Sequence, residues 1–431
     1  MAAQGKTFNA SKSNFGFKGW VLIIYAFVFF FVNTSVGSSW QLMATAWESD
    51  LGWSSTTLLS WVSYGSLLSV VLGLVLSRVA TKFSVRRMCI VCAVVLCAAL
   101  FVFGYAPNVQ IACLLEMIIC GTDITLAYIL NPMILTNWFP RKKGLVMGWA
   151  TIGCPAGGGV AAIIVNYVQE HFGYQVSYMP FAVLALIFTV ILVVMIRDYP
   201  EECGVNPDND ESMTREQANA MIQKQREAEK HSPWTLARCL KCPQLWVMAL
   251  ALGVSNMVGG TMGTLMLRIT DLGYTTTWGA NMILFSSLVS FPFSYLFGLL
   301  DSKKGPKVGM QWVYIVTIGA MVCLAQGSYL ALILAMIFLG AAVGGGANFA
   351  ASVTAEYWGQ ANFSRVFGVV YPILQIVGSM ASAFIVQTAA LFGGYVGSYI
   401  CLAVANAVAL IAFTMALKNR DFVKKLESSW T

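Results

Sequence analysis

Long apolar runs separated by short polar segments dominate the chain. Because about 20 apolar residues in a helix cross the roughly 30 Å hydrocarbon core of a membrane, runs of this length predict membrane-spanning helices. The predicted spans cover residues 20–40, 55–79, 89–105, 109–135, 144–168, 178–196, 244–266, 278–300, 308–325, 329–353, 366–391 and 395–417. Six lie on each side of a polar stretch. The expected fold class is an all-α polytopic membrane protein of twelve transmembrane helices in two six-helix bundles.

The composition agrees with a membrane protein. Of the 431 residues, 58% are hydrophobic and only 10% are charged, whereas a soluble globular chain carries about 25% charged residues. The polar first 18 residues are not followed by a small-residue cleavage site, so we expect a tail and not a cleaved signal peptide.

The basic residues predict the orientation. With the N-terminus in the cytoplasm, all but one of the 26 Lys and Arg residues fall on cytoplasmic segments, and Arg268 is the exception. Basic loops resist translocation, so this asymmetry sets topology. The expected organisation is a cytoplasmic N-terminal tail, an N-terminal bundle, a cytoplasmic linker, a C-terminal bundle and a cytoplasmic C-terminal tail. These cover residues 1–18, 19–196, 197–243, 244–417 and 418–431.

The polar stretch in the middle contains "ESMTREQANAMIQKQREAEK", which is rich in helix formers and mixed in charge. This composition predicts a solvated helix that joins the halves. The halves resemble repeats: "SRVATKFSVRR" after the second span matches "GLLDSKKGPK" after the eighth. Parallel six-helix repeats with a central site between them characterise one class of transporter.

These features resemble the major facilitator superfamily over nearly the whole chain. More narrowly, "SSWQLMATAWESDLGWS", "NWFPRKKGLVMG" and "RDYPEECGVNPD" resemble the oxalate/formate antiporter-like branch, a relative of the monocarboxylate porters. The resemblance implies alternating access, with a cavity lined by the first, fourth, seventh and tenth spans.

The loop after the second span departs from the family pattern. The family has Gly and Asp where this chain has Ser77 and Thr81, while the second copy keeps Asp301. In the family this loop helps to latch the halves together; alternatively, its basic residues serve only topology. The residues expected at this cytoplasmic gate are Lys82, Arg86, Arg87, Arg141, Lys142, Lys143, Asp301, Lys303 and Lys304.

Glycine and proline concentrate on the fifth and tenth spans. On the fifth, the family's antiporter-type signature ends as Gly-Pro, two residues, Gly-Gly, and Cys154 replaces the first of these glycines, directly before Pro155. Small residues let helix backbones approach closely, and a proline bends a span, so both packing and a moving hinge remain open. The residues concerned are Pro155, Gly157, Gly158, Gly159, Gly344, Gly345 and Gly346.

Two acidic residues fall within the fourth span. Asp123 and Glu116 are seven residues apart and therefore share one helix face. Charge is costly within a membrane, so such residues are functional candidates. Desolvation raises the pKa of a carboxyl group, which suits a proton carrier. The carboxylate would also suit a counter-ion for a cationic solute, or a hydrogen bond between helices.

Polar side chains occur at comparable depth on other presumed cavity helices. The candidates for the substrate cavity are Asn33, Tyr128, Asn131, Asn256, Asn348 and Gln375. A carboxylate substrate calls for a fixed cation, yet the eighth and eleventh spans have no central Lys or Arg. Arg365 lies at a cytoplasmic end, and Arg268 is expected to be an interfacial anchor. A dicarboxylate is therefore poorly supported.

We expect a secondary transporter of the cytoplasmic membrane that moves a small organic solute, by proton coupling or exchange. The solute that we expect first is a monocarboxylate or a related organic anion. The alternative is proton-driven export of a cationic or amphiphilic compound. A sensor with the same fold that does not transport is the alternative from another class. We expect a monomer in lipid, with no catalytic residues, cofactor, metal or nucleic-acid partner. Cys239 and Cys242 form a lone CxxC without a second pair at zinc spacing.

Overall fold

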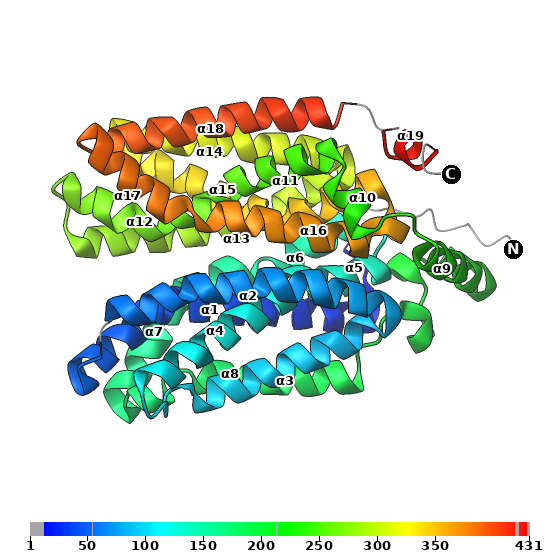
Figure 1. Cartoon of the computed structure of the whole chain (residues 1–431), viewed down its shortest axis with the longest axis horizontal. Coiled ribbons are helices and arrows are strands. Elements are labelled where there is room, and N and C mark those ends of the chain that lie inside the picture. The colour runs from blue at the N-terminus through cyan, green and yellow to red at the C-terminus, as the bar shows by residue number, and fades with distance from the viewer. Residues whose placement is uncertain (1–12, 54, 213, 419–421, 429–431) are drawn as a thin grey trace, which may run out of the picture.

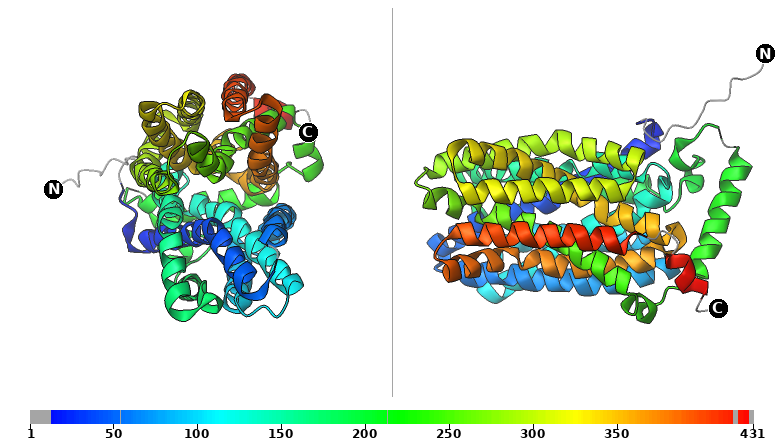
Figure 2. Two further views of the ribbon diagram at one scale, coloured as in Figure 1. Left: turned by 90° about the vertical axis from the view of Figure 1, so that its left-hand side faces the viewer. Right: turned by 90° about the horizontal axis from the view of Figure 1, so that it is seen from above.

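Two bundles of long helices lie side by side in the computed structural model, which describes residues 13–53, 55–212, 214–418 and 422–428. The first half and the second half form separate groups, and one helix of the linker crosses one end of both (Figure 1). The end view and the view from above agree on this arrangement (Figure 2). We call the end that carries this helix the linker end and the opposite end the far end.

The helices follow the predicted spans closely. The first half contains α1 (Gly16–Leu51), α2 (Ser55–Lys82), α3 (Val85–Phe103), α4 (Val109–Thr125), η1 (Leu126–Leu130), α5 (Asn131–Trp138), α6 (Lys143–Ala150), α7 (Gly153–Phe172), η2 (Tyr174–Val176) and α8 (Met179–Val194). The linker contains η3 (Pro200–Cys203), η4 (Pro207–Asn209), α9 (Arg215–Lys230) and α10 (Leu236–Leu240). The second half contains α11 (Pro243–Asn256), α12 (Val258–Asp271), α13 (Thr276–Lys304), α14 (Pro306–Gln326), α15 (Tyr329–Trp358), α16 (Gln360–Ser379), α17 (Ala381–Phe392), α18 (Tyr395–Ala416) and α19 (Phe422–Ser428).

Within the described residues, 11 helical segments are long and apolar enough to cross a membrane. The remaining predicted span, 55–79, coincides with α2, in which the apolar segment found is the shorter Leu67–Leu76. The fold class is therefore the expected one, an all-helical membrane protein with two halves.

The fourth and fifth spans depart from a continuous α-helix. The fifth span divides into α6 and α7 at Thr151 and Ile152. A proline ring clashes with the carbonyl four residues earlier, and Thr151 stands four residues before Pro155, which explains the break. The fourth span carries the π-helical turn η1 directly after α4, and π turns frequently mark functional positions.

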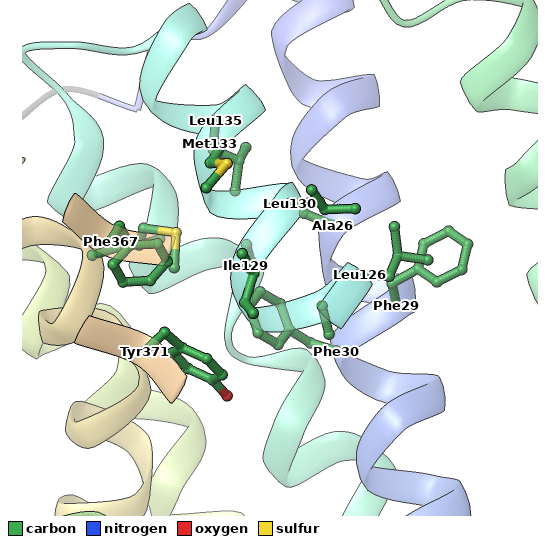
Figure 3. Close-up of a cluster of buried hydrophobic side chains, with 14 of the residues drawn as sticks. Ala26, Phe29, Phe30, Leu126, Ile129, Leu130, Met133, Leu135, Phe367 and Tyr371 are labelled. Carbon is green, nitrogen blue, oxygen red and sulfur yellow. The ribbon is translucent and has the colours of Figure 1, made fainter. Parts of the chain in front are cut away.

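The two halves share one hydrophobic core at the linker end. This core joins first-half residues such as Ile129 and Met133 to second-half residues such as Phe367 and Tyr371 (Figure 3). A second core, centred on residues such as Leu265, belongs to the second half alone. Backbones also meet here, since a Cβ added at Gly148 of α6 would stand 3.0 Å from the Cα of Gly298 in α13. The structure therefore shows a conformation in which the halves are packed together toward the linker end.

The predicted linker helix is confirmed as α9, but the flanks of α9 are docked on the bundles. On the first-half side, Asp208 is fully buried and accepts hydrogen bonds from the backbone N–H groups of Arg141 (3.1 Å) and Lys142 (2.8 Å). The guanidinium of Arg141 also forms ion pairs with Asp208 and Asp210. Burial raises the pKa of Asp208, and the hydrogen bonds from Lys142 and Arg141 oppose that effect.

On the other side of α9 the linker is held by the second half. Ser232 donates a hydrogen bond of 2.6 Å to Asn362, and its own carbonyl accepts one of 2.9 Å from Arg365. The indole N–H of Trp234 donates to Glu427 at 2.7 Å. Each flank of α9 is thus fixed to a different half.

Candidate functional site

A polar pair joins α1 and α4 of the first half. The side-chain amide of Asn33 in α1 donates a hydrogen bond of 3.2 Å to Oδ2 of Asp123 in α4. Asp123 is 2% exposed, and its Oδ1 has no hydrogen-bond partner within the described part of the chain. The start of α4 is fixed by Asn108, whose side chain accepts from the N–H of Ile111. Two of the predicted site residues are therefore in direct contact, with one carboxylate oxygen still available.

Glu116 lies two turns from Asp123 on the same helix, in different surroundings. It is 1% exposed, and neither of its carboxylate oxygens has a hydrogen-bond partner among the described residues. The Tyr178 hydroxyl lies within electrostatic reach of it, and Tyr178 packs with Trp40 and Phe103 in an aromatic group of the first half. Glu116 is thus enclosed within one half.

Tyr128 of η1 contacts the second half directly. Its ring stacks on Tyr371 of α16, with centroids 5.6 Å apart and an interplanar angle of 16°. Phe30 packs edge-on against the same tyrosine at 5.1 Å, and the Tyr128 hydroxyl lies 3.5 Å from the Cys154 sulfur. The Asp123 charge reaches both that hydroxyl and that thiol. We call the following set of residues the central site: Asn33, Asp123, Phe30, Tyr128, Cys154 and Tyr371.

The remaining cavity candidates are distributed differently. Asn131 is 1% exposed and lies beside Cys89 of α3, inside the first half, so we leave it out of the central site. Gln375 is half-buried and follows Tyr371 by one turn of α16. Asn256 ends α11, is exposed, and packs against Gly378. The side chain of Asn348 lies outside the described residues.

The glycines of the fifth and tenth spans lie at close helix contacts. Gly157 faces the backbone of Phe31 in α1, and a Cβ on Gly344 would stand 2.5 Å from the carbonyl of Ser290 in α13. Gly159 is turned toward Ser287 of the other half. Gly158 lies beside Thr34, Gly345 faces the ring of Phe297, and nothing lies within 4 Å of a Cβ on Gly346. Close packing accounts for Gly157, Gly344 and Gly345. The break before Pro155 is the observation that favours a hinge.

The residues expected at the cytoplasmic gate divide into those near the loop after the eighth span, which is the second-half copy, and those in the loop after the second span, which is the first-half copy. In the second-half copy, Asp301 is 5% exposed and lies against Gly144, in the first turn of α6. A carboxylate at a helix N-terminus is stabilised by the helix dipole, so Asp301 contributes to contact between the halves. Lys143 lies within electrostatic reach of Asp301, and Lys303 and Lys304 are exposed.

In the first-half copy, the contacts stay within one half. Arg86 donates to the carbonyl of Val193 and, through its backbone N–H, to Asp198. Arg87 is exposed. The side chains of Ser77, Thr81 and Lys82 lie outside the described residues.

Arg268 is not the interfacial anchor that the sequence suggested. It is 4% exposed, and its Nε and Nη2 donate hydrogen bonds to the carbonyls of Leu324 (3.2 Å) and Ala325 (3.3 Å). These carbonyls belong to the last turn of α14, where helical partners are lacking. Nη1 pairs with Asp271 at 2.9 Å. All three guanidinium nitrogens of Arg268 thus have partners, and two of them join α12 to α14.

Sequence reasoning missed Phe30 and Tyr371 and did not assign Cys154 to the site. The signal for Cys154 was present, because it replaces the first glycine of the span-five signature. Nothing in an apolar span distinguishes Tyr371 from the aromatic residues that face lipid. Among the described residues, no group of three or more His, Cys, Asp or Glu side chains is arranged to hold a metal ion.

Two bundles of membrane-length helices packed against each other are the architecture of one class of membrane transporters. The family model of the Major Facilitator Superfamily matches residues 22–383, so the chain belongs to this family. It is a secondary transporter embedded in a membrane, and not an enzyme.

Known relatives agree on the family. The uncharacterised transporter YhjX of Escherichia coli is 22% identical over 84% of this chain and 86% of its own length. The hexuronate transporter of Bacillus subtilis is 26% identical, over 42% of this chain and 43% of its own. None of these matches bears on the oxalate/formate branch.

Solved structures show the same fold. The proton:xylose symporter XylE covers 96% of this chain and 98% of its own, with a TM-score of 0.73 and 14% identity. The Escherichia coli fucose:proton symporter FucP covers 95% and 100%, with a TM-score of 0.67 and 12% identity.

Proposed function

We propose that the chain couples the movement of a small organic solute, bound without net negative charge, to a proton carried by Asp123. The supporting observation is the central site itself. It holds a carboxylate with one free oxygen, an amide and two phenols at the boundary between the halves.

The charge of the site favours a neutral bound solute. Binding an anion inside a membrane calls for a fixed cation, and every Lys and Arg of the sequence except Arg268 lies at a predicted cytoplasmic segment. Arg268 is already engaged by α14 and Asp271. A monocarboxylate would therefore bind as the neutral acid, together with its proton, and other uncharged polar solutes fit equally.

The proton role belongs to Asp123 and not to Glu116. Alternating access requires that a coupling group be accessible from each side of the membrane in turn. Asp123 lies close to Tyr128, which contacts Tyr371 of the second half. Glu116 is buried in the first half, within electrostatic reach of Tyr178.

A second candidate is the export of an organic cation. In that case the ionised Asp123 would serve as its counter-ion, and the rings of Phe30, Tyr128 and Tyr371 would suit a cation. The observation that favours it is the same unpaired Oδ1.

Counterflow in proteoliposomes separates the two functions. The panel contains neutral sugars and a hexuronate, after the solutes named for the relatives, together with monocarboxylates and organic amines. If the solute is neutral, Asp123→Asn abolishes accumulation driven by a pH gradient and leaves counterflow intact. If it is a cation, the same change abolishes both. Accumulation that persists in Asp123→Asn would remove the proposed coupling role.

The placement of the basic residues predicts that the linker end is cytoplasmic. The protein would then lie in the cytoplasmic membrane with both termini inside, and the conformation shown would be closed toward the cytoplasm. Cysteine labelling from each side of the membrane tests this orientation.

A further inference from the structure

The stacked rings of Tyr128 and Tyr371 come from different halves. Tyr128 belongs to η1 of the first half and Tyr371 to α16 of the second, and Tyr371 is 5% exposed. Stacked aromatic pairs are stabilising beyond the area that they bury. The pair is therefore a specific contact that must separate if the halves move apart at this level.

The pair lies at the edge of the shared core that is nearer to the central carboxylate. Along the fourth span, Asp123 comes first, Tyr128 follows, and Met133 lies further toward the linker end. Along α16, Phe367 lies one turn toward the linker end from Tyr371 and contacts it at 5.8 Å. Figure 3 shows Phe367 and Tyr371 of α16 facing η1 across the boundary. On the linker side of Asp123, the pair is thus a direct contact between the two halves.

Both rings are carried on irregular helix. Tyr128 lies in a π turn. Tyr371 immediately precedes Pro372, which lies inside α16 and lacks an N–H for the carbonyl four residues earlier, that of Gly368. Helices bend at such places. The backbone that holds each ring is thus able to move without unwinding a full span.

We propose that the Tyr128–Tyr371 stack is the inner gate of the transport pathway, and that its separation opens Asp123 to the linker end. The core around Phe367 and Met133 separates when the halves move apart as a whole, whereas the stack is the part of the central site that lies next to Asp123 on the linker side. Tyr371 would therefore be a gating residue supplied by the second half, whatever the solute.

Cys154 provides a native reporter for this gate. Its thiol lies 3.5 Å from the Tyr128 hydroxyl and is 6% exposed. A membrane-impermeant maleimide should reach it from the linker end only when the stack is open. Cys154→Ser supplies the background from the ten other cysteines.

The test compares Tyr371→Ala with Tyr371→Phe, each with and without Cys154→Ser. Maleimide is applied from either side of sealed vesicles that contain the full-length protein. In Tyr371→Ala, labelling of Cys154 from the linker end should rise about tenfold, because the stacking contact is lost. In Tyr371→Phe it should stay within about twofold, because a phenyl ring stacks as well.

Three results would overturn the proposal. Unchanged labelling in Tyr371→Ala would mean that the stack does not close the path. An equal rise in Tyr371→Phe would assign the effect to the hydroxyl, and a rise from both ends alike would indicate general loosening. Should Tyr371→Ala not fold, Tyr371→Leu keeps the apolar volume without a ring and is expected to give the same rise. Because labelling requires no solute, the outcome is independent of the proposed coupling by Asp123.

Discussion

The amide of Asn33 and the carboxylate of Asp123 meet across 3.2 Å between two antiparallel helices, α1 and α4. This contact satisfies Oδ2 and leaves Oδ1 without a described partner. The pair thus combines a fixed orientation with an oxygen free to take a proton or a solute.

Asn33→Ala should impair transport most at high pH. The ionised Asp123 would then lose its described hydrogen-bond donor, and losing a partner of a buried polar group costs about 1–3 kcal/mol. At low pH the carboxyl group is protonated and depends less on the amide. Initial rates of counterflow between pH 5 and 9 measure the effect.

The matched control for this change is Asn131→Ala, which removes an amide inside the first half beside Cys89. It should leave the shape of the pH profile unchanged. Identical profiles for Asn33→Ala and the wild type would contradict a functional role for the pair.

Glu116→Gln should leave accumulation driven by a pH gradient intact, in contrast to Asp123→Asn. The physical reason is the burial of Glu116 inside the first half, beside Tyr178. The measurement is the ratio of solute inside and outside proteoliposomes at steady state. A loss of accumulation as large as that in Asp123→Asn would make Glu116 part of the coupling.

Gly148→Leu should force the halves apart at the linker end. A Cβ there would already stand 2.9 Å from the Ser294 carbonyl and 3.0 Å from the Gly298 Cα. Overpacking costs about 1–3 kcal/mol, enough to shift a conformational equilibrium by about tenfold. Labelling of Cys154 from the linker end should therefore increase.

Gly346→Leu is the control for Gly148→Leu, because nothing lies within 4 Å of a Cβ at that position. It should behave as the wild type. If both variants label alike, the contact between α6 and α13 does not determine the conformation.

Arg268→Met should lower the melting temperature without changing solute affinity. The change removes hydrogen bonds from a charged group to Leu324, Ala325 and Asp271, each worth about 1.5–3 kcal/mol at most. Arg268→Lys keeps the charge but loses the planar fork, so its melting temperature should fall less. Weaker solute binding with unchanged thermal stability would instead place Arg268 in the transport pathway.

The fold was predictable because the bilayer demands about 20 apolar residues for each helical crossing. The spacing of Asp123 and Glu116 placed both on one face correctly, yet it did not separate a residue at the boundary of the halves from an enclosed one. Asn131 shows the same limit, since it turns to Cys89 of its own half. Tyr371 was missed because lipid-facing and boundary-facing aromatics have the same periodicity. The contacts of Arg268 were not predicted, because the carbonyls at the end of α14 become its neighbours only in the folded structure.

The docking of the linker has a consequence for how the molecule is put together. Residues before α9 are held by Arg141 and Lys142, and residues after it by Asn362 and Arg365. A break in the chain within α9 would leave the first fragment with the anchors of Arg141 and Lys142, and the second with those of Asn362 and Arg365. The two fragments, produced as separate polypeptides in one cell, should therefore associate into a working carrier. A continuous chain would then ensure that the two halves are made in equal amounts, and it would not be required for their assembly.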